Sequence, residues 1–239
     1  MNNENGVFID KIKSLIKSKF GAFINEDRPE IFKEFLKDYE YETKFQVHNI
    51  ESALKVFNIL QGFNIQCLEI RSEEHHLYSD MADQSVCKIF LKPDDYPKWI
   101  KLKSSRSTLF TDNLKIPLIK RRGVKTSLSR LKDTDLLSKL TNLTFISTFK
   151  KETINLFFTY KDAIFSLSFS LAHNDRGFTH NQAELEYEGE CSSRNARNEE
   201  GILSLYDDLI ANHFYSFEFN AEAKADVLNK YEAFREIPR

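Results

Sequence analysis

The spacing of hydrophobic positions changes near Tyr39. In residues 6–38 apolar side chains recur every fourth position, which predicts helices, and Pro29 stands in the first turn of the second of them. From residue 39 onward most segments alternate apolar with polar residues, which is the period of a strand. We therefore divide the chain into a helical extension, 1–38, and a strand-rich domain, 39–239, that ends in helices.

The strand-rich domain combines many short strands with a few helices. Strands are predicted at 39–49, 63–80, 85–92, 99–105, 116–122, 143–151, 154–160, 163–172 and 182–190. Helices are predicted at 50–62, 127–140, 199–214 and 222–237. Short strands of this kind, with helices beside them, predict an α+β fold, here a closed antiparallel β-barrel of about eight strands that forms a tunnel with flanking helices.

Two of the predicted strands carry three ionisable side chains at alternate positions. Alternate residues of a strand point to one side, roughly 6.5 Å apart, so neighbouring carboxylates repel each other unless a cation lies between them. For either strand alone, the solvated side of a sheet is the simpler explanation of the charged face. The residues are Glu40, Glu42 and Lys44 in one strand and Glu184, Glu186 and Glu188 in the other.

Basic residues recur on other strands of the same domain. If the strands close into a barrel, one face of each points inward, and strands whose apolar face packs under helices leave a polar face to line the interior. Segment 163–172 fits this arrangement, because one of its faces is apolar and the other is mostly serine. A sheet with its serines in bulk water is the alternative. The candidate basic residues are Lys101, Lys103, Lys120, Arg122 and Lys150.

In their order along the chain, these motifs resemble those of the CYTH family, also called triphosphate tunnel metalloenzymes. E-Y-E-T-K (40–44) is similar to the family's opening Glu-x-Glu-x-Lys signature, and E-L-E-Y-E (184–188) to its closing Glu-x-Glu strand. The resemblance spans residues 39–219. Weaker similarities stand between the two ends, at 75–80 (HHLYSD), 101–103 (KLK), 116–120 (IPLIK) and 148–151 (TFKK).

This resemblance implies a metal-dependent phosphohydrolase that cleaves the terminal phosphate of inorganic triphosphate or a nucleoside triphosphate inside the tunnel. Mg²⁺ or Mn²⁺ would be held by Glu40, Glu42, Glu184 and Glu186. Substrate phosphates would be bound by Lys44, Lys101, Lys103, Lys120, Arg122 and Lys150. The catalytic residues would be Glu42, Glu186, Glu188 and Lys44.

The sequence departs from the family pattern in two places. Lysine stands at 101 and 103 where the family commonly has arginine, and lysine offers a point charge in place of a bidentate fork. The acidic residue that often ends the strand at 163–172 is missing, with Asp175 the nearest substitute. These departures make a catalytically weak module that binds or senses polyphosphate an alternative function. An adenylate cyclase of the same fold is another alternative, because the resemblance implies that the same tunnel supports that chemistry in part of the family.

Composition argues against several other classes. The formal net charge of −2 argues against a DNA-binding protein. An RNA 5′ end stays an alternative substrate, although no added aromatic–basic surface supports it. Three widely spaced cysteines form neither a zinc motif nor a disulfide framework, and His75, His76 and His173 are more typical of surface or structural roles than of a metal site. No signal peptide or membrane span is recognisable, so we expect a cytoplasmic protein that does not bind membranes. The sequence does not indicate an oligomeric state.

Overall fold

The fold is seen in a computed structural model, which covers most of the strand-rich domain. Of the region 6–38, the few described residues are helical, and the helix predicted at 222–237 lies outside the described residues. Most of the helix predicted at 127–140 lies outside them too. The structure describes residues 10, 11, 14, 18, 39–46, 55, 58–79, 86–91, 99–114, 116–127, 144–192 and 197–214.

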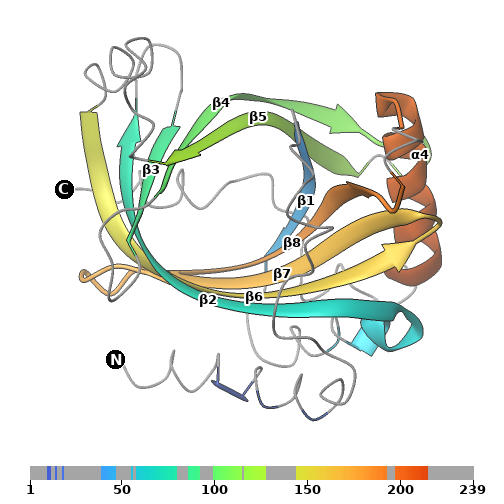
Figure 1. Ribbon diagram of the computed structural model, residues 1–239, viewed down its shortest axis with the longest axis horizontal. Helices are drawn as coiled ribbons and strands as arrows, with labels where there is room; N and C mark the ends of the chain where they lie inside the picture. Colours follow the sequence, from blue (N-terminus) through green and yellow to red (C-terminus); the bar gives the residue numbers. More distant parts are fainter. Residues whose placement is uncertain are drawn as a thin grey trace.

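Eight strands of the described part form one antiparallel sheet (Figure 1). They are β1 (Glu40–Gln46), β2 (Asn64–Ser79), β3 (Val86–Leu91), β4 (Trp99–Phe110), β5 (Pro117–Ser127), β6 (Thr144–Tyr160), β7 (Ala163–His173) and β8 (Thr179–Glu190). Each strand pairs with two neighbours, in the order β1-β5-β4-β3-β2-β6-β7-β8, and β8 pairs with β1 to complete a ring. The predicted α+β fold with an antiparallel sheet is confirmed.

Strand β6 is longer than the sequence suggested. The two strands predicted at 143–151 and 154–160 are one continuous strand, because Glu152 and Thr153 pair with β2 on one side and β7 on the other. The turn predicted at Lys161–Asp162 is confirmed. Both turn residues have positive φ, 46° and 63°, as a tight hairpin between twisted strands requires.

The hydrophobic core lies outside the ring, between the sheet and helix α4 (Glu199–Leu209), which continues into the π-helical turn η4 (Ile210–Phe214). Leu205, Tyr206 and Leu209 of α4 belong to the same buried cluster as Phe165 and Leu167 of β7. The helix begins at Asn198, whose side chain accepts a hydrogen bond from the Gly201 N–H. Among the described residues, no helix is both long and apolar enough to cross a bilayer.

Tyr206 attaches this helix to the two strands that close the ring. Its buried hydroxyl accepts a hydrogen bond from the Tyr187 N–H at 2.8 Å and donates to the Tyr41 carbonyl at 2.7 Å. Tyr41 belongs to β1 and Tyr187 to β8. The helix therefore fixes the outer side of the β1–β8 pair, and the alternate residues of both strands face the inside of the ring.

Candidate functional site

The two acidic segments predicted from the sequence lie side by side. Strands β1 and β8 pair so that Glu42 stands opposite Glu186 and Lys44 opposite Glu184. On the next strand, β7, Ser166 stands opposite Glu186 and Ser168 opposite Glu184. These side chains share the inner face of the ring, since their neighbours in the sequence belong to the outer core.

Lys44 joins carboxylates of both strands. Its Nζ atom lies 2.9 Å from Oε1 of Glu42 and 3.1 Å from Oε1 of Glu184. Burial alone would lower the pKa of Lys44, but the charges of Glu184 and Glu42 and their hydrogen bonds outweigh burial and raise the pKa above its ordinary value. Lys44 therefore stays protonated and holds the two carboxylates together.

Serine hydroxyls of β7 bind the carboxylates of β8. Ser166 donates a hydrogen bond to Oε1 of Glu188 at 2.7 Å, and Ser168 donates a longer one, 3.4 Å, to Oε2 of Glu184. Ser166 and Ser168 are both buried. The polar face of β7, one of two alternatives left open by the sequence, thus orients the carboxylates that lie beside it.

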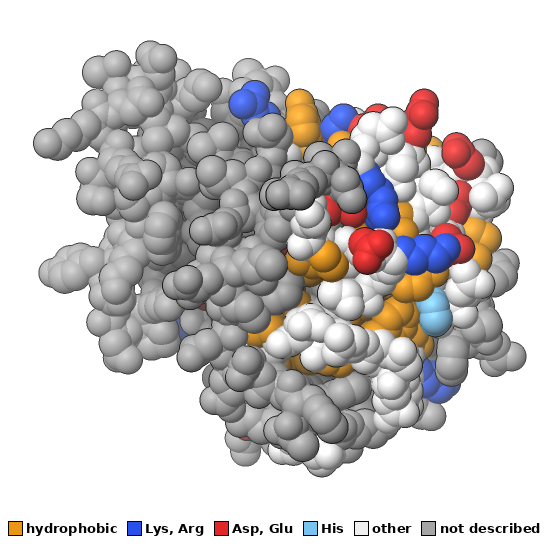
Figure 2. Space-filling model, turned by 45° about the vertical axis from the view of Figure 1, so that its right-hand side comes forward, with side chains coloured by type: hydrophobic (Ala, Val, Ile, Leu, Met, Phe, Trp, Pro, Cys, Tyr) orange, Lys and Arg blue, Asp and Glu red, His pale blue; other side chains and the backbone are white. Residues whose placement is uncertain are grey.

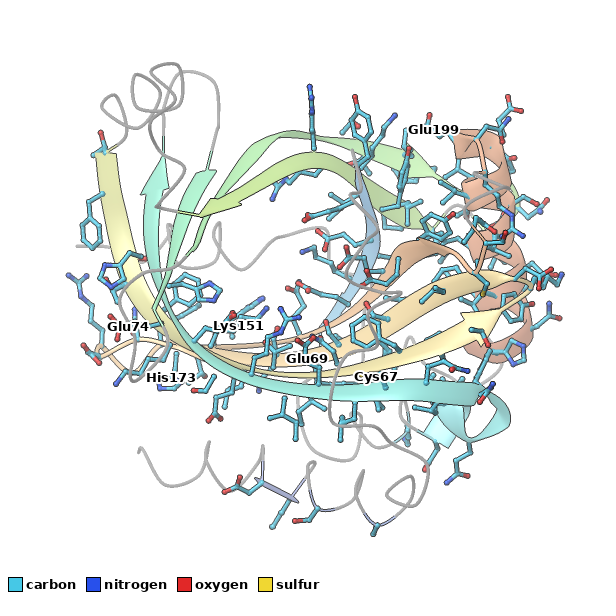
Figure 3. All side chains as sticks on the ribbon, viewed as in Figure 1. Cys67, Glu69, Glu74, Lys151, His173 and Glu199 are labelled. Atoms are coloured by element: carbon cyan, nitrogen blue, oxygen red, sulfur yellow. The ribbon has the colours of Figure 1, made fainter. Side chains whose placement is uncertain are left out.

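A second charged row on the inner face comes from β2 and was not identified from the sequence. Glu69, Arg71 and Glu73 alternate along β2 and stand opposite Asn155, Thr153 and Lys151 of β6. Arg71 forms an ion pair with Glu69, and Asn155 donates a hydrogen bond to the same Glu69 oxygen. Figure 3 shows Glu69 and Lys151 on the inner side of the sheet. The same alternate spacing that identified β1 and β8 was the available signal.

Arg71 connects this row to the acidic strands. Burial lowers its pKa, but the hydrogen bond to Glu69 and the negative charges of Glu69, Glu73 and Glu188 together raise it. Glu188 therefore lies close enough to Arg71 to interact with it electrostatically. Charged side chains therefore line the inner face on both sides of the serines of β7.

Glu73 is the most strongly perturbed carboxylate of this row. Burial would raise its pKa, but the hydrogen bond from His75 and the charges of His75, Lys151 and Arg71 lower the pKa to about 2. The Nε2 atom of His75 lies 3.1 Å from Oε2 of Glu73, and its ring packs 5.0 Å from that of Phe149. Glu73 is thus ionised at all pH values at which the protein is expected to work.

Glu73 should make the stability of the protein depend on acid pH. A carboxylate whose folded-state pKa is depressed stabilises the fold above its unfolded-state pKa of 4.5, and this stabilisation is lost as the pH falls toward 2. Glu73→Gln should therefore lower the free energy of unfolding most at neutral pH, by roughly 3 kcal/mol more than at pH 2, at about 1.4 kcal/mol per pKa unit. Urea unfolding from pH 7 to pH 2 measures this difference.

Glu74→Gln is the matched control, because Glu74 is the next residue on the same strand, faces outward and pairs with His76. It should change the pH profile little. A Glu73→Gln profile parallel to that of the wild type would contradict the assigned ion pairs.

Three predicted substrate-binding residues do not lie on the inner face. Lys120 reaches outward, where it bonds Glu199 of α4 at 2.5 Å and lies over the ring of Tyr39 at 4.6 Å. Arg122 is two residues further along β5, hence on the same outer side, and is exposed. Lys150 is exposed too and stands in register with the outward-facing Glu74. Their predicted placement was wrong.

The inward-facing cations are the immediate neighbours of these residues. Arg121 is buried and pairs in register with Glu40 of β1, and Lys151 pairs with Glu73. Both belong to runs of consecutive basic residues. A basic side chain therefore faces inward whichever alternate residues of the run point to the inside. Figure 2 shows acidic and basic side chains next to one another on the α4 side of the molecule, consistent with outward residues that form surface ion pairs such as Lys120–Glu199.

Lys101 and Lys103 are placed by their backbone alone. Both lie on β4, where Lys101 stands opposite Lys88 of β3 and Lys125 of β5. The side chains of these residues lie outside the described part of the structure. Their contact with phosphate stays a prediction.

The carboxylates of β1 and β8 are suitable metal ligands, but they do not surround a common position. Among the side chains that the structure describes, no three from His, Cys, Asp or Glu lie close enough together to hold a metal ion. Lys44 supplies the physical reason, because its ammonium group takes the position between Glu42 and Glu184. The predicted ligands Glu40, Glu42, Glu184 and Glu186 nevertheless belong to paired strands, and Glu40 and Glu42 are buried.

Comparisons with known proteins add information on the fold. No protein-family model matches the chain, and a search of the curated proteins gave no match. Among solved structures, the chain resembles HpAC1 from Hippeastrum, a proposed adenylyl cyclase described as having a dominant triphosphatase activity. The TM-score is 0.50, the sequence identity is 13%, and the match covers 82% of this chain and 95% of that one.

Two further solved structures have lower TM-scores. The triphosphatase of the Mimivirus capping enzyme matches with a TM-score of 0.47 and 13% identity, over 79% of this chain and 94% of that one. An adenylate cyclase homologue from Bacillus halodurans matches with 0.46 and 15%, over 83% of this chain and 99% of that one. Identities at this level concern the fold alone. The chain therefore has a fold similar to that of HpAC1, and its chemistry has to be argued from its own side chains.

Proposed function

We propose that the protein is a metal-dependent phosphohydrolase that removes the terminal phosphate from inorganic triphosphate or a nucleoside triphosphate inside the ring of strands. One observation carries the proposal. Two acidic segments, about 140 residues apart in the sequence, meet in register on the inner face with Lys44 between them. The triphosphatase activity described for HpAC1, which has a similar fold, supports the same reaction class.

The cations of the inner face suit a polyanion. A triphosphate cannot lie among carboxylates unless positive groups compensate for the charge of the phosphates and of the carboxylates. Lys44, Arg71, Arg121 and Lys151 supply such groups from four different strands. The arginines offer paired N–H donors that match two phosphate oxygens at once. Lys101 and Lys103 of β4 would extend this set.

A divalent metal fits the donor chemistry of the acidic strands. Carboxylate oxygens are the ligands that Mg²⁺ and Mn²⁺ prefer, and Glu40, Glu42, Glu184 and Glu186 would hold the ion. When bound, the ion neutralises phosphate oxygens and polarises the terminal phosphoryl group. The Lys44 ammonium would leave Glu42 and Glu184 and bind a phosphate oxygen, which keeps every charge compensated.

Glu188 is the residue best placed to act on the attacking water. The Ser166 hydrogen bond fixes one of its oxygens, and Arg71 lies nearby. Glu188 would orient the water and accept its proton as the oxygen forms a bond to the terminal phosphorus and the bond to the bridging oxygen breaks. Orthophosphate and a diphosphate, free or on the nucleoside, are the products. Glu42, Glu186 and Lys44 would complete the catalytic set.

A binding module without turnover is the second candidate. It is favoured by the Lys44 contacts, which hold two of the four proposed metal ligands in an ion pair. Cyclisation of ATP is a third outcome, since the name of HpAC1 includes adenylyl cyclase. In each case the small-molecule partner is a triphosphate, and the protein would act in the cytoplasm.

Product analysis separates these candidates. Triphosphate, ATP, GTP and pyrophosphate should be incubated with the full chain and Mg²⁺ or Mn²⁺, with phosphate and cyclic AMP measured together. We expect phosphate release from at least one triphosphate, and none without metal. Cyclic AMP without phosphate release would identify a cyclase, and calorimetric binding without either product would identify the binding module. Neither binding nor turnover of any triphosphate would refute the proposal.

A further inference from the structure

The inner face of the ring has an apolar row at one end. Cys67, Phe157 and Ile164 come from the neighbouring strands β2, β6 and β7. They are 0%, 1% and 2% exposed and form a cluster separate from the outer core. Polar residues continue the inner face beyond this row. The apolar row therefore ends the polar lining, and its role differs from that of the core under α4.

Strand register places this row on the inner side. Phe157 pairs with Ser166 on one side and Cys67 on the other, and it lies two residues from Asn155. Ser166 and Asn155 both bind inner-face carboxylates. The next residue, Phe158, belongs to the outer core. Phe157 and Phe158 thus point to opposite sides of the same wall.

On the described side chains of β2, the inner face becomes exposed to solvent beyond this row. Cys67 is fully buried, whereas the side chains of Glu69 and Arg71 are 22% and 36% exposed. Exposure falls again to 15% at Glu73 and 1% at His75. Within the side chains of β2 described up to His76, the reachable stretch from Glu69 to Glu73 covers four residue steps, or roughly 13 Å along the strand. An extended anion has limited length available to it here.

We propose that the row of Cys67, Phe157 and Ile164 is a floor that determines how far a phosphate chain enters and therefore which phosphate is cleaved. This inference rests on the proposed function. A phosphate chain would enter with its terminal phosphate first and stop at Phe157, beside Ser166 and the carboxylates of β8. The row offers no hydrogen-bond partner for a phosphate oxygen apart from a weak thiol, so deeper penetration would bury charge without compensation.

The floor selects a chemical class of substrate. It admits a short phosphate chain with a free end, such as triphosphate or the terminal phosphates of a nucleotide. It excludes a long polyphosphate that would have to pass through the ring. The specificity-determining residue is Phe157, because its side chain is the largest of the three.

The products released from tetraphosphate test this proposal. Initial rates of orthophosphate and pyrophosphate release should be measured, with calorimetric binding of triphosphate as a second measurement. Because the chain enters end first and stops at the floor, we expect the wild type to cleave the terminal phosphate, with an initial rate of orthophosphate release from tetraphosphate at least about tenfold above that of pyrophosphate release, the effect of about 1.4 kcal/mol. Phe157→Ala should reduce this preference severalfold by opening the floor. Phe157→Leu, a milder truncation, serves if the alanine variant does not fold.

Phe158→Ala is the matched control, since it removes the same side chain from the outer side of β6. It should destabilise the protein by a similar amount and leave the preference for terminal cleavage unchanged. Equal initial release of orthophosphate and pyrophosphate from tetraphosphate by the wild type, or an equal loss of preference in both variants, would overturn the floor while leaving the phosphohydrolase intact. Failure to bind triphosphate at all would overturn both.

Discussion

Phosphate release from triphosphate should fall by about 10²- to 10³-fold when Glu42 is replaced by Gln, the loss typical of removing one preorganised charged group from an active site. Glu42 is buried and lies opposite Glu186 in the β1–β8 pair. The amide has nearly the same shape as the carboxylate but lacks its charge, so the variant should bind the metal poorly without a large structural change. Steady-state rates with saturating metal measure the loss.

Metal binding provides a second measurement for the same variant. Added Mn²⁺ should raise the melting temperature of the wild type and have little effect on Glu42→Gln. Glu199→Gln is the matched control, because this carboxylate lies on α4 outside the ring and pairs with Lys120. It should retain wild-type rates. Full activity in Glu42→Gln would show that the inner carboxylates are not the active site.

Replacing Lys44 by Met should lower the free energy of unfolding by about 3–5 kcal/mol, because it leaves two buried carboxylates without their cation. The side chains of Lys44, Glu42 and Glu184 are 3%, 4% and 12% exposed, so water compensates little. For a chain of this size, such a loss corresponds to a fall in melting temperature of roughly 10 °C. Chemical and thermal unfolding of the metal-free protein measure it.

Removing one of the carboxylates as well should restore part of this stability. In Lys44→Met combined with Glu184→Gln, only Glu42 remains uncompensated. The free energy of unfolding of the double variant should therefore fall by less than the sum of the two single losses. Mn²⁺ should stabilise Lys44→Met more than the wild type, since the ammonium no longer competes for the carboxylates. Additive losses in the double variant would contradict the ion pairs observed here.

Strand faces were predictable in β1 and β8, where charged and uncharged residues alternate. The period of two in 40–44 and 184–188 placed each set of carboxylates on one face, and the register of β1 with β8 then brought the two sets together. Alternating serines in β7 identified its polar face in the same way. Closure of the ring explains the result, because it gives every strand a distinct inner and outer side.

In a run of consecutive basic residues, the residue that faces inward was not predictable by this reasoning. Lys120, Arg121 and Arg122 offer a cation in either register, and only the pairing of Arg121 with Glu40 decides which one faces inward. Lys150 and Lys151 pose the same problem. The row on β2 was missed for another reason, since its alternating signs look like a solvated strand until the opposite wall is known.

The pairing of β1 with β8 has a consequence for how the chain folds. This contact links residues about 140 positions apart, so it forms only after a large loss of chain entropy, and folds rich in such contacts form slowly. Until β8 is synthesised and docked, β1 and β7 each present an open row of backbone donors and acceptors that another molecule can pair with. A chain in which β8 has not yet docked is therefore more exposed to aggregation than the closed ring.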